Sequence, residues 1–414
     1  MNRILLTGNK AAAWGARLAG AEYIPAFPIT PQTEIIETLA YWIDSGEMDS
    51  RMTTLESEHS MLTAAGAAAV TGVRVFTATS SQGLLYGMEM LYTIAGWRAP
   101  FVLVNVSRGL SSPITLEPDH NDVLAARDSG FLQIHCATCQ EVLDGILIAY
   151  RLAEHENVRL PVLVNMDGFY LSFTREPVEI PDMETVQRFL RGYDAENIRF
   201  RAGAPLSEAV AVLGGTLYSY FRYQMHLAAL NGLAAFRSIA DEFSTVFGRA
   251  YREVEGYRTD DAELVFLMIG SFATKAKAAV DRLRDEGMSV GLVRPILLRP
   301  FPHEHIRNLL LGKKAVAVID QNLSMGRGGV LHTEVASSLY GMQGPLPVIA
   351  SFIGGLGGRD ISAEEFYEMA NSTLRSAECG HTPPPRLLFT REELTEVRRM
   401  QEIAGVSRTV ETKS

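Results

Sequence analysis

The chain has 414 residues, of which 47% are hydrophobic and 21% are charged, and its formal net charge at pH 7 is −10. This length suggests two or three domains, and the composition excludes a disordered or collagen-like chain. The negative charge argues against binding to nucleic acid or to an anionic membrane. No apolar run reaches the roughly 18 residues of a membrane-spanning helix. Because 3 cysteines cannot form a disulfide framework, we expect a cytoplasmic location.

The first 180 residues alternate buried strand patterns with helical patterns. This alternation predicts an α/β fold, a parallel sheet with helices on both faces. We expect strands at 74–81, 101–108, 131–135 and 161–168, and helices at 58–72, 84–97 and 140–156.

The rest of the chain contains a second, smaller α/β pattern. It follows an irregular stretch and a helical pattern at 236–257, and its elements are expected at 262–271, 274–287, 289–302, 314–321 and 348–358. We therefore predict four parts: a catalytic domain at 1–180, a connector with a helical segment at 181–257, the smaller domain at 258–360, and an interaction tail at 361–414.

Two prolines bracket Thr30 in the stretch FPITP. Each proline fixes its own φ and keeps the preceding residue out of the helical region, so Thr30 lies on a pre-set turn just before a helix. Its hydroxyl and nearby N–H groups are then available to an anion. The alternative is a plain helix entry, with Pro31 as the first helical residue and Thr30 as its cap.

Glu56 and Glu58 precede a strongly apolar helical pattern. A carboxylate in a first turn commonly complements the helix dipole. The residues after Glu58 are nearly all apolar, however, so we expect it to be buried with a raised pKa and to need a partner.

Polar residues also follow two predicted strands. Ser81 ends the strand at 74–81 and Gln82 and Gly83 follow it, at the edge where ligands bind in open sheets, although a simple capped turn explains them equally well. Arg108 ends the next strand and suits bidentate carboxylate binding. The long loop after it contains Asp-His-Asn-Asp at 119–122, which is a weak metal signal, and we predict no metal site.

Two further motifs favour structural roles. Cys136 and Cys139 form a CxxC pattern in which Cys139 would begin a helix, a position that favours a thiolate, but the rest of a redox unit is missing. The glycine-rich GGLGGRD at 354–360 lacks the context of a dinucleotide site. The GDG signature that binds diphosphate and magnesium in thiamine enzymes is absent from the sequence.

Taken together, the motifs resemble the α subunit of a 2-oxoacid:ferredoxin oxidoreductase of the pyruvate type. The matching stretches include GNKAAAWGARLAGAEYIPAFPITPQTEIIE, ESEHSMLTAAGAAAVTGVRVFTATSSQGL, RGLSSPITLEPDHNDVLAARDSG and VGLVRPILLRPFP, and the resemblance runs from about 5 to 360. It implies a pyrimidine-binding-type thiamine-enzyme domain followed by a domain like the transketolase C-terminal domain.

The resemblance also implies a site shared between subunits. Glu58 matches the glutamate that contacts N1′ of the thiamine aminopyrimidine, and Thr30 and Arg108 match the residues that hold the 2-oxoacid. A β subunit would hold the diphosphate with Mg²⁺. Further γ and δ subunits, and a ferredoxin or NAD-linked electron-transfer subunit, would carry [4Fe–4S] clusters, and coenzyme A would accept the acyl group. Such enzymes belong to anaerobic metabolism.

Two departures from the family pattern bear on the substrate. Phe27 stands where the family usually has Tyr, and Gly109 where the pyruvate type usually has Ala. Pyruvate and an aryl-substituted 2-oxoacid such as phenylglyoxylate both stay open as substrates. Two other classes of protein remain as alternatives: another thiamine enzyme of the dehydrogenase E1 or transketolase type, and a non-catalytic scaffold.

Overall fold

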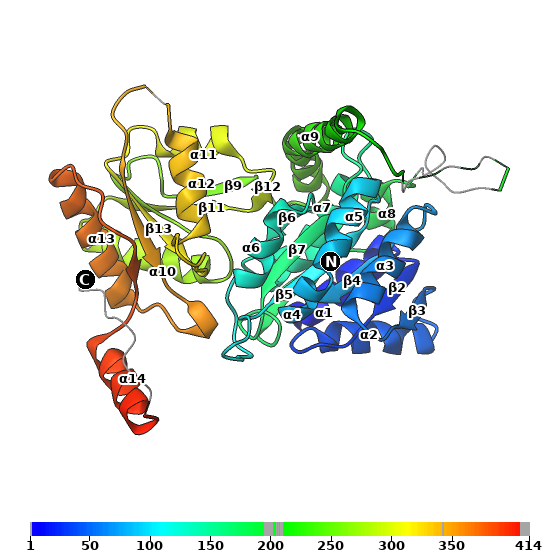
Figure 1. Ribbon diagram of the computed structural model, residues 1–414, viewed down its shortest axis with the longest axis horizontal. Helices are drawn as coiled ribbons and strands as arrows, with labels where there is room; N and C mark the ends of the chain where they lie inside the picture. The colour runs from blue at the N-terminus through cyan, green and yellow to red at the C-terminus, as the bar shows by residue number, and fades with distance from the viewer. Residues whose placement is uncertain are drawn as a thin grey trace.

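The computed structural model describes residues 2–193, 202–203, 205, 207, 210–341 and 343–405. Two α/β units lie side by side, with the N-terminal unit in blue to green and the second unit in yellow to orange (Figure 1). Within these residues no helix is long and apolar enough to cross a bilayer.

The first unit is built on a five-stranded sheet with the order β12-β6-β7-β5-β4. Its four parallel strands lie within the ranges that the sequence predicts, which confirms the first α/β pattern. They are β4 (Phe76–Thr79), β5 (Val102–Ser107), β6 (Leu132–His135) and β7 (Val162–Asp167). The fifth strand, β12 (Leu297–Arg299), comes from the second half of the chain and pairs antiparallel with β6. The two units therefore share a sheet.

Helices cover both faces of this sheet. On one face, α1 (Gly8–Ala19) and α7 (Cys139–Ala153) pack on the valines of β5 and β7. On the other face, α3 (Glu58–Ala69) and α5 (Met88–Trp97) pack on Leu103 and Leu163. The smaller helical elements are α2 (Thr33–Asp44), α4 (Gln82–Tyr86), α6 (Asn121–Ala125), the 3-10 turn η1 (Ala126–Asp128) and α8 (Met183–Leu190).

Two small sheets complete the first unit. In one, β1 and β8 are antiparallel, and in the other, β2 and β3 are parallel. Their bounds are β1 (Asn2–Thr7), β2 (Tyr23–Ala26), β3 (Arg51–Thr54) and β8 (Arg175–Ile180).

The second unit contains a six-stranded sheet with the order β15-β14-β13-β10-β11-β9, parallel except for β9. Its strands are β9 (Val254–Tyr257), β10 (Leu264–Leu267), β11 (Val290–Pro295), β13 (Ala315–Asp320), β14 (Val348–Ile353) and β15 (Arg386–Leu387). Its other elements are α10 (Phe272–Asp285), α11 (His303–Leu310), α12 (Val330–Leu339), the turn η2 (Leu356–Gly358) and α13 (Ala363–Glu378).

The connector differs from its prediction. Helix α9 (Gly215–Phe247) starts well before 236 and ends at Gly248, which adopts a left-handed conformation with φ 74° that suits glycine. Residues 254–257, predicted as helix, form β9 and join the second sheet. The helical prediction for 248–257 is therefore wrong, because Gly248 terminates the helix.

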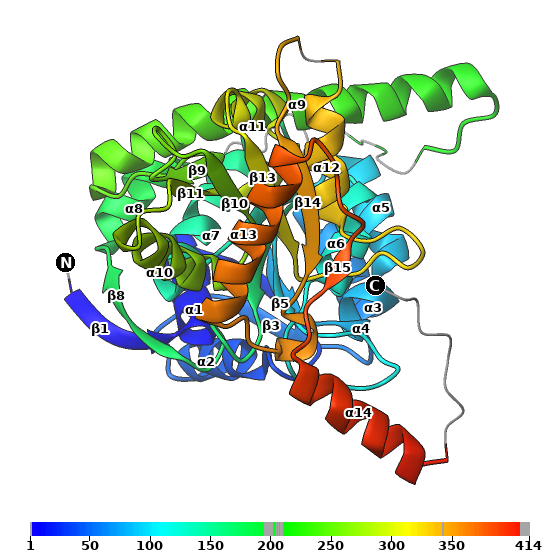
Figure 2. The same cartoon turned by 90° about the vertical axis from the view of Figure 1, so that its left-hand side faces the viewer.

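The segment after 360 is only partly a tail. Helix α13 packs on β13 and β14, and β15 extends the second sheet by pairing with β14. Helix α14 (Arg391–Ile403) buries none of its residues and extends away from the body of the molecule (Figure 2). Arg359 anchors its start, donating to both carboxylate oxygens of Glu393 at 2.8 and 2.7 Å. An interaction role for this helix stays a prediction.

Candidate active site

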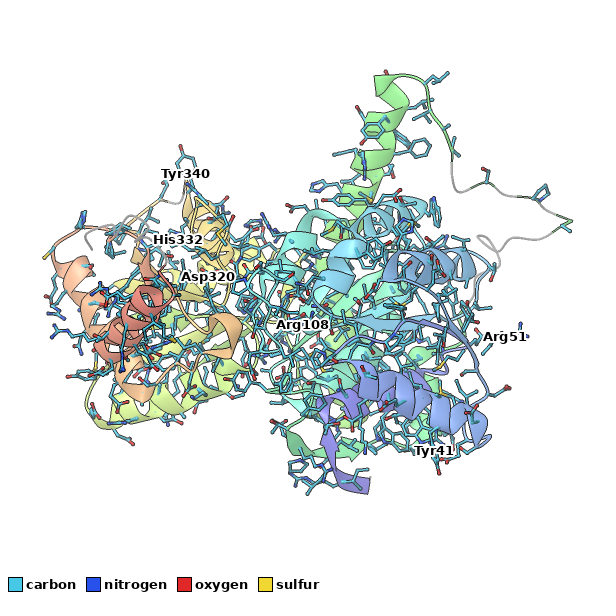
Figure 3. The ribbon with its side chains drawn as sticks, turned by 60° about the horizontal axis from the view of Figure 1, so that its bottom comes forward. Tyr41, Arg51, Arg108, Asp320, His332 and Tyr340 are labelled. Atoms are coloured by element: carbon cyan, nitrogen blue, oxygen red, sulfur yellow. The ribbon has the colours of Figure 1, made fainter. Side chains whose placement is uncertain are left out.

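Four segments far apart in the sequence meet at the carboxyl ends of β4 and β5. They are the turn before α2, the start of α3, the turn from β4 into α4, and the end of β5. Figure 3 places Arg108 near the centre of the molecule, between the two units. The structure brings together all six residues that the sequence selects: Thr30, Glu58, Ser81, Gln82, Gly83 and Arg108.

Arg108 joins two of these segments. Its Nη1 donates to the Thr30 carbonyl oxygen at 2.8 Å, and its Nη2 donates to Gln82 Oε1 at 2.6 Å. Its buried Nε has no hydrogen-bond partner in the part of the chain that the structure describes. Burial lowers the pKa of Arg108, although a guanidinium stays protonated in proteins. The result is a fixed, buried cation with donor capacity to spare, which suits an anionic ligand.

Ser81 occupies a strained backbone conformation at the turn into α4. Its φ of 49° and ψ of −121° cost an L residue on the order of 1–3 kcal/mol. Its N–H donates to Asp122 Oδ2 at 3.0 Å, and its single hydroxyl proton has two acceptors within reach, the Gly109 carbonyl oxygen at 3.0 Å and Gln82 Oε1 at 2.7 Å. These contacts stabilise the strained conformation of Ser81 and orient the Gln82 side chain toward Arg108.

Thr30 does not cap α2. The helix begins at Thr33 with Gln32 at its N-cap, so the alternative that Thr30 caps a helix starting at Pro31 is wrong. The turn is held instead by Asn9 Nδ2, which donates to the Pro31 carbonyl oxygen at 2.8 Å, and by Gln32 Nε2, which donates to the Phe27 carbonyl oxygen at 3.0 Å. Thr30 itself is exposed, so its hydroxyl is open to a ligand.

Glu58 is the first residue of α3, behind the N-cap Ser57. It is only 5% exposed, and burial raises the pKa of its carboxyl, which confirms the expectation from the sequence. Among the described residues no side chain pairs with this carboxylate, and the Glu58 backbone N–H donates to it, which opposes the effect of burial on the pKa. Glu56 differs: it is exposed, and its bond with Ser60 lowers its pKa. Within the described residues, the structure thus singles out Glu58 as a buried carboxylate without a side-chain partner.

The Glu58 carboxylate lies directly against Gly83. A Cβ atom at position 83 would lie 2.4 Å from Glu58 Oε1 and 2.6 Å from Thr79 Oγ1. We therefore expect Gly83→Ala to push the carboxylate away and to destabilise the protein by about 1–3 kcal/mol through overpacking. Thermal unfolding of the full chain measures this.

Gly96→Ala is the matched control for that variant. Gly96 is an exposed residue of α5, and nothing lies within 4 Å of a Cβ atom there. Alanine at such a helical site stabilises by about 0.5–1 kcal/mol. Equal changes in melting temperature in the two variants would show that Gly83 is not packed against Glu58.

Asp122 is a functional-site residue that the sequence analysis missed. It is fully buried and accepts from the backbone N–H groups of Ser81 at 3.0 Å and Arg108 at 3.3 Å, and from the Ser107 hydroxyl at 2.6 Å. Burial raises its pKa, and the hydrogen bond from Ser107 opposes this shift. One carboxylate therefore ties together the ends of β4 and β5. Its sequence signal was the Asp-His-Asn-Asp cluster, which we interpreted only as a weak metal motif.

A second buried carboxylate joins the two units. Asp167 Oδ1 lies 2.7 Å from His120 Nε2, and its Oδ2 accepts from the backbone N–H and the hydroxyl of Ser271, at 2.7 and 2.6 Å. The pKa of His120 is raised by Asp167, against an opposing effect of burial. Across the described ranges, no group of three or more His, Cys, Asp or Glu side chains is placed to hold a metal ion.

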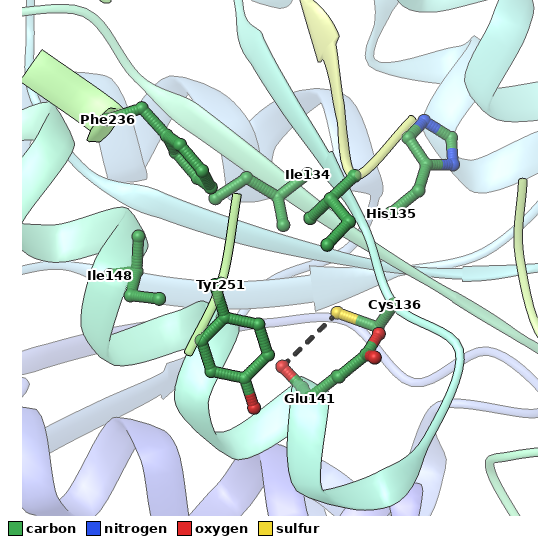
Figure 4. Close-up of a pocket in the computed structure, with 9 residues that line it drawn as sticks. Ile134, His135, Cys136, Glu141, Ile148, Phe236 and Tyr251 are labelled. Carbon is green, nitrogen blue, oxygen red and sulfur yellow. Dashed lines mark hydrogen bonds between the residues drawn. The ribbon is translucent and has the colours of Figure 1, made fainter. Parts of the chain in front are cut away.

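Of the two CxxC cysteines, Cys136 lines a small pocket between β6, α7 and α9. Cys136 Sγ donates to the Glu141 carbonyl oxygen at 3.4 Å, among Ile134, Tyr251 and other apolar side chains (Figure 4). Both cysteines are buried free thiols, and burial raises their pKa. Cys139 does begin α7, but burial outweighs the effect of the helix terminus. These thiols therefore stay protonated, as structural cysteines do.

Comparison with known proteins assigns this arrangement to a family. Residues 14–234 match the model of the pyruvate flavodoxin/ferredoxin oxidoreductase thiamine diphosphate-binding domain, and residues 262–366 match the pyruvate:ferredoxin oxidoreductase core domain II. The chain belongs to the pyruvate:ferredoxin oxidoreductase family. It is therefore a 2-oxoacid oxidoreductase chain.

Individual relatives within this family cover nearly the whole chain. Pyruvate synthase subunit PorA of Pyrococcus abyssi is 39% identical over 92% of this chain and 96% of its own length, and PorA of Thermotoga maritima is 41% identical over 90% and 96%. Ketoisovalerate oxidoreductase subunit VorA of Pyrococcus horikoshii is 38% identical over 91% and 95%.

Two solved structures agree on the fold. A 2-oxoglutarate:ferredoxin oxidoreductase from Magnetococcus marinus, solved with 2-oxoglutarate, coenzyme A and succinyl-CoA bound, has a TM-score of 0.67 and 21% identity, over 89% of this chain and 65% of that chain. A split-gene transketolase has a TM-score of 0.53 and 13% identity, over 89% and 98%. The predicted α/β fold class is thus confirmed, and the match to the thiamine diphosphate-binding model covers the first α/β unit.

Proposed function

We propose that this chain is the α subunit of a multi-subunit, thiamine diphosphate-dependent 2-oxoacid oxidoreductase. The complex would convert a 2-oxoacid and coenzyme A to acyl-CoA and CO₂ and pass the electrons to iron–sulfur clusters in other subunits. The observation that carries the proposal is the placement of Glu58, buried and without a side-chain partner among the described residues, beside the turn that holds Arg108. A lone buried carboxylate is costly and is commonly retained for chemistry.

The residues of the site fit the aminopyrimidine half of thiamine diphosphate. Glu58 would contact the N1′ nitrogen and exchange a proton with it, and the raised pKa of its carboxyl favours this role in proton exchange. Gln82 Nε2, which is buried and has no partner among the described residues, offers a further donor. The bound cofactor supplies an electron sink for decarboxylation. This chain's contribution is to hold the ring and its proton.

Arg108 and Thr30 would bind the substrate. The buried guanidinium neutralises a carboxylate, and the exposed Thr30 hydroxyl lies beside it because Arg108 Nη1 is bonded to the Thr30 carbonyl. Fixing both groups before substrate arrives lowers the entropy cost of orienting it.

Other subunits would supply the remaining parts. A β subunit would bind the diphosphate and its Mg²⁺, since this sequence has no GDG signature. A γ or δ subunit or an electron-transfer partner would bind the [4Fe–4S] clusters. The 3 cysteines of this chain are too few for the four ligands of one cluster, and Cys136 and Cys139 are buried. Two relatives are named as subunits of pyruvate synthase and of ketoisovalerate oxidoreductase, which supports an assembly of this kind.

The substrate is proposed to be pyruvate or a related 2-oxoacid, with an aryl-substituted acid such as phenylglyoxylate as the runner-up. Gly109 bears on this choice. A Cβ atom at this position would lie 2.6 Å from Thr115 Cγ2 and 3.1 Å from Asp119 Oδ2. Glycine therefore lets the long loop fold back against the end of β5, where the Gly109 N–H donates to the Glu117 carbonyl oxygen at 3.0 Å. Activity of the purified complex on pyruvate, 2-ketoisovalerate and phenylglyoxylate decides among the substrates.

The isolated chain is expected to bind thiamine diphosphate only weakly, because the diphosphate carries most of the cofactor's charge and its binding signature is missing here. Calorimetric titration of the purified chain, alone and with its co-purifying subunits, measures this. Micromolar binding by the chain alone would contradict a shared site.

Co-purification distinguishes the alternatives. A brown complex with iron–sulfur clusters supports the oxidoreductase. A colourless complex that turns over sugars or feeds a lipoyl carrier would indicate another thiamine enzyme, and an inactive complex that assembles normally would indicate a scaffold.

A further inference from the structure

A row of polar side chains crosses the buried sheet of the first unit. The strand register places Thr79 of β4 beside Asn105 of β5, Asn105 beside Asn165 of β7, and Asn165 beside His135 of β6. All four are at most 1% exposed. Parallel strands buried on both faces are ordinarily continuous apolar runs. Two residues earlier, β5 and β7 do carry leucines on this face, Leu103 and Leu163.

The polar atoms of this row form few hydrogen bonds with the rest of the described protein. One direct bond runs along it, from Asn105 Nδ2 to Asn165 Oδ1 at 2.9 Å. In the described part of the chain, five buried atoms of the row have no partner: Thr79 Oγ1, Asn105 Oδ1, Asn165 Nδ2 and both ring nitrogens of His135. Figure 4 shows the His135 ring pointing away from the cysteine pocket, so the polar groups of that pocket do not form hydrogen bonds with the ring. Several such atoms in one layer point to internal water.

The two ends of the row reach charged groups. At one end, Thr79 Oγ1 and Glu58 Oε1 both lie against Gly83, at 2.6 and 2.4 Å from the position that a Cβ atom would take there. At the other end, the His135 ring lies 6.0 Å, centroid to centroid, from His120, whose Nδ1 is also buried without a partner among the described residues. His120 Nε2 is bonded to Asp167.

We propose that Thr79, Asn105, Asn165 and His135 bind a chain of internal water molecules that joins the Glu58 carboxylate to the buried His120–Asp167 pair. Each water would bond to side chains that otherwise lack partners. Each water or side chain between the ends gives up one O–H or N–H proton as it receives another and so keeps its charge, while one end, Glu58 or His120–Asp167, loses the proton that the other end gains.

His135 suits the relay position between the rest of the row and His120. Burial and the nearby charge of His120 lower its pKa to about 3, so the ring is neutral at ordinary pH. A neutral imidazole donates from one nitrogen and accepts at the other, which is what a relay position requires. The charged groups close to the row are Asp122, which accepts from Asn105 Nδ2 at 3.0 Å, and Arg294 and Arg299 near His135.

A high-resolution crystal structure of the full chain, alone or within its complex, tests the water sites directly. We expect ordered water within hydrogen-bond distance of Thr79 Oγ1, Asn165 Nδ2 and His135. A structure without water density along the row would overturn the proposal. This test needs no activity, so its outcome is independent of the proposed function.

Thr79→Val with Thr77→Val as its control tests the role of the row, and this part rests on the proposed function. Both threonines are buried on β4, but the Thr77 hydroxyl donates to the Pro25 carbonyl oxygen at 2.7 Å and lies outside the row. In the assembled complex, Thr79→Val should lower kcat at least about tenfold with the KM of the 2-oxoacid unchanged. Thr77→Val should leave both constants unchanged. Equal kinetics in the two variants would overturn the relay, whereas a wild-type complex without 2-oxoacid activity would instead refute the proposed function.

Discussion

Glu58→Gln in the assembled complex is expected to lower turnover by roughly 10²–10⁴, the range for losing acid–base assistance. Glutamine keeps the shape of the side chain, but its amide does not exchange a proton with a ring nitrogen. Burial disfavours the charged form of Glu58, as its raised pKa shows, so the uncharged glutamine should not destabilise the protein. The complex should therefore still assemble and hold cofactor. If Glu58 only complements the dipole of α3, the change should cost under about 1 kcal/mol of stability and leave the chemistry nearly intact.

Exchange of the thiazolium C2 proton into deuterated water, followed by quenched NMR, isolates this step from electron transfer. Glu56→Gln is the matched control, because Glu56 lies two residues away but is exposed and bonded to Ser60. We expect slow exchange in the first variant and normal exchange in the second. Wild-type exchange in an assembled Glu58→Gln complex would leave Glu58 as an ordinary helix-terminus residue.

The sequence could predict what depends on local pattern. The buried strands 101–108 and 161–168 are apolar runs, and their carboxyl ends lie at one edge of a parallel sheet by topology alone. Arg108 and the turn after β4 were therefore predictable site positions. The burial of Glu58 was predictable too, since an apolar helix follows it and α3 packs into the core.

Long-range pairing could not be predicted in the same way. Nothing local indicates that Arg108 would bond to the Thr30 carbonyl, 78 positions away, or that Asp122 would collect the backbone N–H groups of two strand ends. The crossing of β12 into the first sheet depends on the packing of the two units against each other. The start of β9 was hidden because Arg-Glu-Val-Glu continues a helical charge pattern past Gly248.

Arg108→Lys is expected to act mainly on the substrate. Lysine keeps a positive charge, but one ammonium cannot reach the Thr30 carbonyl and Gln82 Oε1 while also presenting a flat pair of donors to a carboxylate. Losing one charge-assisted hydrogen bond costs about 1.5–3 kcal/mol, which corresponds to a fall of roughly 10- to 150-fold in kcat/KM for the 2-oxoacid. The KM of coenzyme A should stay unchanged.

Arg98→Lys separates this effect from a general loss of packing. Arg98 is also partly buried, and its guanidinium likewise donates to backbone carbonyls, those of Val158 at 2.7 Å and Arg159 at 3.1 Å, but it caps α5 away from the site. Steady-state kinetics on both complexes, with each substrate varied in turn, should show the loss only for Arg108→Lys and only for the 2-oxoacid. An unchanged kcat/KM for the 2-oxoacid in that variant would remove Arg108 from the substrate site and leave it as the residue that fixes the Thr30 turn against α4.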